Sequence, residues 1–120
     1  MKKWNQVIGK KGEDLAAAYL SARGVNILAR NQRTQYGEIN LVGFQKDTYI
    51  FIEVKTRTSM KYGFPELAIT ESKLQHMIDC ATEYMQTRDI DTAMRIDVIS
   101  IVFTQTNAQP EMEWIQNVTR

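Results

Sequence analysis

An acid and a lysine stand one residue apart at the end of an apolar run. Glu53 and Lys55 follow the segment Tyr49–Ile52, whose side chains are aliphatic or aromatic. Because side chains alternate along a strand, Glu53 and Lys55 share one face of an extended chain. Unpaired charge in a buried strand is costly, so this pair requires either charged partners or a bound ligand.

A second β-rich segment, Glu38–Phe44, precedes this run and is joined to it by a short polar loop, which predicts a β-hairpin. A loop of two or four residues gives the same register, in which Asn40 lies opposite Glu53 and Glu38 opposite Lys55. Two carboxylates, an amide and an ammonium within this span can hold a divalent cation through hard oxygen ligands. The alternative is structural: a Glu38–Lys55 ion pair, with Asn40 hydrogen-bonded to Glu53.

The elements around this hairpin follow from periodicity and end signals. A helical pattern covers residues 9–23 and ends at Gly24, and a second helix begins after Thr70 as its N-cap. The order of elements is helix, three strands, helix, two strands, which predicts an α/β fold with a mixed sheet and a helix on each face. The expected strands cover residues 25–28, 38–44, 49–56, 95–103 and 112–118.

Length and composition fit one globular domain over residues 1–120. The chain has 120 residues, of which 43% are hydrophobic and 24% charged. It has no apolar run of about 18 residues and no secretion signal, so we expect no membrane partner. A single cysteine, Cys80, cannot form an internal disulfide and is expected to be a structural thiol; it favours a cytoplasmic location. Of the other titratable groups, His76 is expected on a solvated face and Asp97 as a paired structural acid.

Charge is distributed unevenly along the chain. Residues 1–61 hold 11 Lys/Arg against 5 Asp/Glu, whereas residues 62–120 hold 4 against 9. Such asymmetry favours a surface that binds a polyanion. The alternative is that these charges are ordinary solvent-exposed surface residues. Phosphate contacts of this kind depend steeply on salt. The expected phosphate-binding residues are Lys10, Lys11, Arg30, Arg33, Arg57 and Lys61.

Several motifs resemble, in order and from end to end, the YraN family of small bacterial proteins. These motifs are GxxGEDLAAAYL at Gly9–Leu20, NILARNQR at Asn26–Arg33, YGEINLV at Tyr36–Val42, IFIEVKTR at Ile50–Arg57, GFPELAI at Gly63–Ile69, RIDVI at Arg95–Ile99 and EWIQNV at Glu113–Val118. The family in turn resembles the restriction-endonuclease-like PD-(D/E)xK superfamily, archaeal Holliday-junction resolvases in particular. The resemblance implies a three-layer α/β/α fold around a mixed sheet of about five strands, and a phosphodiesterase site that uses Mg²⁺ or Mn²⁺.

Carried over to this chain, the resemblance implies a role for each residue of the motif. Glu53 would be a metal ligand, with the carbonyl of Val54 as a second one. Lys55 would orient or deprotonate the attacking water and stabilise charge on phosphorus. Glu13, on the first helix, would reach the metal directly or through water. From its position alone, Glu13 is an acid near a helix N-terminus, where the helix dipole favours it.

The chain departs from the family pattern at Asn40. The pattern is G-E-I-D, and its aspartate is the expected first metal ligand, whereas this chain has G-E-I-N. Asparagine keeps one oxygen of similar reach and loses the charge, which weakens binding of a hard divalent cation. Glu38 lies on the same face and can compensate in part. We therefore predict weakened Mg²⁺ binding and reduced or absent catalysis.

Three functional hypotheses follow. The first is an endonuclease that hydrolyses phosphodiester bonds in structured or branched DNA, for which a homodimer would supply the two sites that a double-strand cut needs. The second is a nucleic-acid-binding module that keeps the fold and lacks a competent metal site. The third is a protein-interaction subunit whose acidic second half meets a partner.

Overall fold

The computed structural model describes residues 4–58, 69–103 and 109–119. Lys61 and nearly all of the Gly63–Ile69 motif therefore lie outside the described residues. The element order agrees with the sequence prediction. The elements are α1 (Trp4–Ala22), β1 (Asn26–Thr34), β2 (Gly37–Gln45), β3 (Thr48–Arg57), α2 (Glu71–Thr87), β4 (Ala93–Val102) and β5 (Glu111–Ile115).

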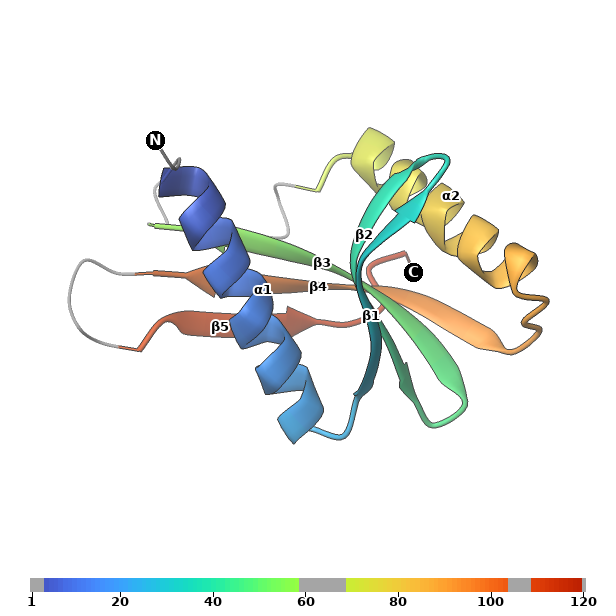
Figure 1. Ribbon diagram of the computed structural model, residues 1–120, viewed down its shortest axis with the longest axis horizontal. Coiled ribbons are helices and arrows are strands. Elements are labelled where there is room, and N and C mark those ends of the chain that lie inside the picture. Colours follow the sequence, from blue (N-terminus) through green and yellow to red (C-terminus); the bar gives the residue numbers. More distant parts are fainter. Residues whose placement is uncertain (1–3, 59–68, 104–108, 120) are drawn as a thin grey trace.

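The five strands form one mixed sheet in the order β1-β2-β3-β4-β5. β3 and β4 are parallel, and the other three neighbouring pairs are antiparallel. Along β3, Ile50 and Ile52 pack with the α1 side chains, whereas Phe51 packs with those of α2. The two helices therefore cover opposite faces, as predicted, and the fold is compatible with a three-layer α/β/α arrangement of the restriction-endonuclease type. Figure 1 shows α1 crossing one side of the strands, and α2 beside the tip of the β1–β2 hairpin.

The predicted helix boundaries have clear local causes. At the end of α1, the N–H of Gly24 donates to Ser21 O and the N–H of Val25 to Leu20 O, the hydrogen-bond pair of a Schellman motif. Gly24 takes the left-handed conformation that this motif requires, with φ of 92°. At the start of α2, the Thr70 hydroxyl accepts a hydrogen bond from the N–H of Lys73 at 3.0 Å.

The β2–β3 hairpin closes as predicted at its turn. Lys46 and Asp47 form a two-residue loop with φ of 52° and 61°, the backbone of a type I′ turn. Phe44 pairs with Tyr49, and their rings meet edge to face with centroids 5.0 Å apart. The pairing continues in this register as far as Leu41 and Ile52.

The predicted pairing does not extend further along β2 and β3. The pairs Asn40–Glu53 and Glu38–Lys55 do not form, because β2 pairs with β3 only from Leu41 onward, and its first residues, Gly37–Ile39, pair with β1 alone. β1 is correspondingly longer than predicted and includes the polar residues up to Thr34. The physical reason is tertiary: the tip of the β1–β2 hairpin docks on α2. There the N–H of Gln35 donates to Glu83 at 2.9 Å, and the hydroxyl of Thr34 to the thiol of Cys80 at 3.3 Å.

The predicted core and structural residues lie where expected. Cys80 is buried, and Asp97 is buried and hydrogen-bonded. His76 is exposed. Within the described residues, no helix combines the length and the apolar character that crossing a membrane requires.

Candidate functional site

The site begins where β2 and β3 separate. The side-chain oxygen of Asn40 accepts a hydrogen bond from the backbone N–H of Val54 at 2.9 Å. A side chain thus takes the place of a main-chain partner one residue beyond the last β2–β3 pair. This contact holds Asn40 against the segment that contains Glu53 and Lys55. The structure therefore brings four of the expected site residues together.

Glu53 is the most enclosed charged group of this site. Its side chain is 13% exposed, compared with 29% for Lys55. The Lys55 ammonium lies 3.9 Å from Glu53 Oε2, and the Lys73 ammonium lies 3.5 Å from the same oxygen. One carboxylate is thus flanked by two cations, one from β3 and one from α2.

Lys73 was missed by the sequence analysis, although its position carries a signal. It is the third residue of α2, three positions after the N-cap Thr70 and within the first turn. The helix dipole makes that turn unfavourable for a cation, and a capping box would place Glu or Gln at this position. A lysine there indicates a partner elsewhere in the fold, and the structure identifies that partner as Glu53.

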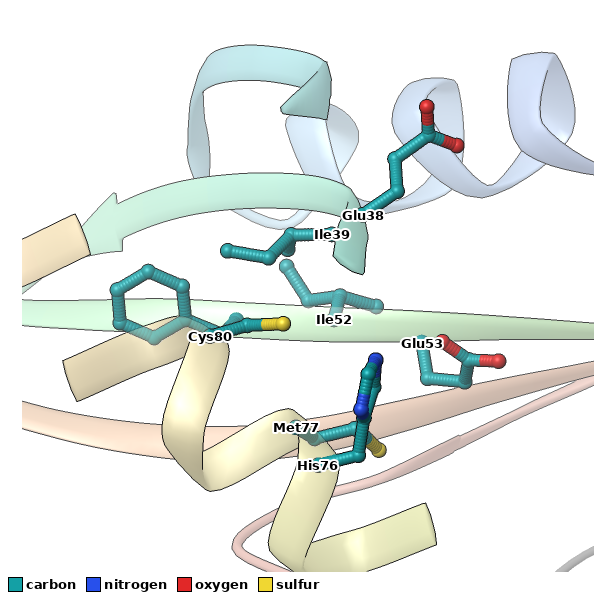
Figure 2. Close-up of a pocket in the computed structure, with 8 residues that line it drawn as sticks. Glu38, Ile39, Ile52, Glu53, His76, Met77 and Cys80 are labelled. Atoms are coloured by element: carbon teal, nitrogen blue, oxygen red, sulfur yellow. The ribbon is translucent and has the colours of Figure 1, made fainter. Parts of the chain in front are cut away.

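Glu38 does not point into the site. Figure 2 shows its carboxylate directed away from Glu53, although both residues line a small pocket between β2, β3 and α2. His76 also lines this pocket. The cavity volume is about 10 Å³, which is about the room that a single water molecule needs. The pocket is therefore too small for a nucleotide, and a polymeric ligand would have to bind over the surface.

Glu13 is held by a different partner. The side-chain amide of Asn31 donates to both Glu13 oxygens, at 3.2 and 3.3 Å. Asn31 lies on β1 in the left-handed conformation, with φ of 50°, within the part of the hairpin that leaves β3. Glu13 is thus fixed to the β1 strand rather than to Glu53 by the described contacts.

These contacts decide how well the residues suit a divalent cation. Within the described ranges, no three His, Cys, Asp or Glu side chains come together in a group that could hold a metal ion. Glu53 is paired with two lysines, and the Asn40 oxygen already accepts a backbone hydrogen bond. Because Mg²⁺ favours carboxylates, this donor set does not fit it. The predicted ligands Glu38 and Glu13 do not join Glu53 in an acidic group.

Part of the predicted basic surface is internally neutralised. Asp14 accepts hydrogen bonds from Arg30 at 2.6 Å and from Lys10 at 3.3 Å. The Arg30 hydrogen bond, followed by that of Lys10, holds the pKa of Asp14 below its ordinary value of 3.8. Lys10 and Arg30 therefore carry less free positive charge than their number suggests.

The other predicted phosphate-binding residues each have their own contacts. The Lys11 ammonium lies 5.6 Å from the centre of the Phe103 ring. Arg33 pairs across the hairpin with Glu38. At the end of β3, Nη1 of Arg57 is buried and has no hydrogen-bond partner among the described residues. Among the described residues, no ion pair joins these three side chains to Glu53 or Lys55.

The matching family model is described as "Uncharacterised protein family UPF0102", and it matches residues 12–101. The chain belongs to the UPF0102 family. This confirms the resemblance to the YraN family, which is the same family. The UPF0102 match includes Asn40, Glu53, Lys55 and Lys73, and it ends before β5.

UPF0102 proteins of several bacteria are similar to this chain over most of their own length. A UPF0102 protein of Geobacter metallireducens is 42% identical over 94% of this chain and 92% of its own length. One from Rhodococcus opacus is 37% identical over 94% of this chain and 96% of its own. One from Caldicellulosiruptor saccharolyticus is 34% identical over 92% of this chain and 94% of its own.

Proposed function

We propose that this chain is a nucleic-acid-binding protein on a nuclease-like fold, which contacts the phosphate backbone at the Glu53–Lys55 site. The observation that carries the proposal is the position of this pair. Glu53 and Lys55 lie on β3 just past the last β2–β3 pair, where the two strands separate. Lys55 presents a partly exposed ammonium there, and an ammonium is a phosphate-binding group.

The shape of the site supports a polymeric ligand. The adjoining pocket has room for about one water molecule, so a ligand would reach the partly exposed Lys55 from the surface rather than from a closed cavity. Phosphates of a nucleic-acid strand can approach such an open surface, with the strand lying across it. The excess of basic residues in the first half of the chain supports the same ligand.

A second candidate is metal-dependent hydrolysis of phosphodiester bonds in structured DNA. The Glu53-Val54-Lys55 arrangement beside Asn40 favours it, because the nuclease families that this chain resembles carry the same spacing. The donor set as it stands weighs against it, because no three His, Cys, Asp or Glu side chains of the described residues come together and Glu53 is already paired with two lysines. We therefore place binding before hydrolysis.

One experiment separates these functions. Labelled duplex, single strand, four-way junction and structured RNA are incubated with the protein in Mg²⁺, in Mn²⁺ and in EDTA. Retention and cleavage are measured on the same samples. Lys55→Ala tests the site, and Lys46→Ala is the matched control, since Lys46 is an exposed lysine on the β2–β3 turn.

The proposal predicts salt-sensitive retention without cleavage, weakened in Lys55→Ala and unchanged in Lys46→Ala. Cleavage that needs metal and disappears in Lys55→Ala would establish the hydrolytic function instead. If none of the probes is retained or cut, both candidates fail, and a protein partner for the acidic second half becomes the leading hypothesis.

A further inference from the structure

We infer that Lys73 of α2 is a second phosphate-binding residue of this site, and that Lys55 and Lys73 together bind a backbone phosphate without a divalent cation. The inference rests on the proposed function and identifies the groups that carry it. It starts from one oxygen atom: both ammonium groups approach Oε2 of Glu53, Lys73 at 3.5 Å and Lys55 at 3.9 Å.

The burial of the three side chains determines which of them can meet a ligand. Glu53 is 13% exposed, whereas Lys55 is 29% and Lys73 is 36% exposed. The carboxylate therefore lies beneath, and the two ammonium groups lie closer to solvent. Each ammonium has three N–H donors, so the described contact with Glu53 does not use all of them.

The charges of the group also favour an anion. Two cations and one carboxylate leave one net positive charge, and partial burial reduces its screening by salt. Glu53 lies between the two lysine side chains and offsets part of their positive charge. In the nucleases that this chain resembles, a metal ion would place positive charge next to a phosphate, as the two lysines would here.

Helix stability does not account for Lys73. The residue lies in the first turn of α2, where the helix dipole disfavours a cation. The other charged residue of that turn, Glu71, follows the expected preference. The location of Lys73 is explained by its ion pair with Glu53 on β3.

The test measures binding of a short labelled DNA duplex by fluorescence anisotropy in EDTA, over a series of NaCl concentrations. Lys73→Met should weaken binding about tenfold at low salt, since a charge-assisted contact is lost. It should also reduce the slope of log K against log salt by about 0.9, the value of one phosphate contact on duplex DNA. Lys73→Arg should keep the slope of the wild type, and Lys46→Met is the matched control that should change neither quantity.

A structural role for Lys73 predicts a different result. If the lysine only ties α2 to β3, Lys73→Met lowers the urea midpoint and leaves the salt slope unchanged, which would overturn the inference. Wild-type protein that retains none of the probes would overturn the proposed function together with the inference. Wild-type binding with an unchanged slope in Lys73→Met would overturn the inference alone.

Glu53→Gln distinguishes the two ammonium groups from a metal ion. Removing the carboxylate leaves both cations free for phosphate, so we expect tighter binding in EDTA and no added effect of Mg²⁺ beyond its ionic strength. If Glu53 were a metal ligand, the same change would abolish binding that depends on Mg²⁺. That outcome, or wild-type binding that requires Mg²⁺, would contradict the inference.

Inorganic phosphate at constant ionic strength supplies the last comparison. A free phosphate lacks the further contacts of a nucleic-acid strand, so it should displace the duplex no better than chloride does. Strong displacement of the duplex from wild type by inorganic phosphate would reassign the site to a small phosphate and overturn the nucleic-acid assignment.

Discussion

The carboxamide of Asn40 forms a hydrogen bond across the gap between two separating strands, with its oxygen 2.9 Å from the backbone nitrogen of Val54. The last β2–β3 backbone pair, Leu41 and Ile52, lies one residue from Asn40 and two residues from Val54. A side chain therefore ends the ladder and satisfies a donor that would otherwise lose its partner. The same side chain stands where the family pattern G-E-I-D predicts an aspartate.

This relationship predicts the effect of Asn40→Asp. The carboxylate can accept the same hydrogen bond from Val54 while adding a negative charge beside Glu53. We expect the affinity for Mn²⁺, measured by isothermal titration calorimetry, to rise about tenfold or more, because affinity follows the number of charged oxygen ligands. Cleavage of the nucleic-acid panel should appear or increase along with it. Equal Mn²⁺ affinity in the two proteins would show that Asn40 does not limit metal binding.

Asn40→Ala tests how much the Asn40–Val54 hydrogen bond contributes to the stability of the fold. It leaves the Val54 N–H without its acceptor, so the free energy of unfolding should fall by about 1–3 kcal/mol in urea titrations. Asn26→Ala, at an exposed position at the start of β1, is the control and should change stability by less than about 0.5 kcal/mol. No difference between Asn40→Ala and this control would mean that the hydrogen bond does not stabilise the strand separation.

Asp97 is the most heavily bonded buried acid of the described structure. It is fully buried and accepts hydrogen bonds from Arg95 Nε at 3.1 Å, from Trp114 Nε1 at 2.8 Å and from Asn117 N–H at 2.8 Å. Asp97→Ala would leave these donors unpaired, one of them charged. We expect a loss of about 3–5 kcal/mol in the free energy of unfolding.

The control for this prediction is Asp91→Ala. Asp91 is exposed just before β4, so its loss should change stability by less than about 0.5 kcal/mol. Asp97→Asn keeps acceptor capacity without the charge and should lie between the two. A small effect of Asp97→Ala would indicate that water replaces the carboxylate.

Gly37 allows the tip of the β1–β2 hairpin to reach α2. Its φ is 134°, and a Cβ atom at this position would overlap Nε2 of His76. We expect Gly37→Ala to destabilise the fold by about 1–3 kcal/mol, through backbone strain and this overlap. Thermal or urea unfolding measures the change.

Two variants test the cause. Adding His76→Ala to Gly37→Ala removes the overlap and leaves the strain, so part of the lost stability should return. Gly9→Ala, in the open part of α1, is the control; it should preserve or raise stability by up to about 1 kcal/mol. Full recovery in the double variant would attribute the whole effect to His76.

Asp14 predicts a specific dependence on pH. Its pKa is lowered from 3.8 in the folded state, first by the Arg30 hydrogen bond and then by that of Lys10. A lowered folded pKa means that the carboxylate adds stability above about pH 3.8, and that this contribution is lost as the pH falls through the folded pKa. Because the group is at the surface, the contribution should shrink in high salt.

An NMR titration of the Asp14 carboxyl carbon measures this directly. Arg30→Gln should return the pKa of Asp14 towards 3.8, whereas Arg88→Gln, after α2, should leave it unchanged. A pKa that Arg30→Gln does not move would show that the Arg30–Asp14 contact is not maintained in solution.

The amino-acid sequence by itself determined the features that depend on neighbours along the chain. Periodicity predicts the order of helices and strands. Capping residues predict the helix ends at Gly24 and Thr70, and turn chemistry predicts the Phe44–Tyr49 pair. All of these signals act over a few residues. The ordered motifs were enough to identify the family. The site pair Glu53 and Lys55 also followed, because strand alternation places them on one face.

Only the tertiary structure decided where β2 leaves β3, and which groups surround Glu53. The strand separation depends on docking of the hairpin tip against α2, through contacts 46 and 48 residues apart in the chain at Thr34–Cys80 and Gln35–Glu83. Lys73 reaches Glu53 for the same reason, since the packing of a helix on a sheet sets which of its first-turn residues faces a given strand. Periodicity along the chain contains no information on such distances, so these partners could be assigned only once the helix and the sheet were placed together.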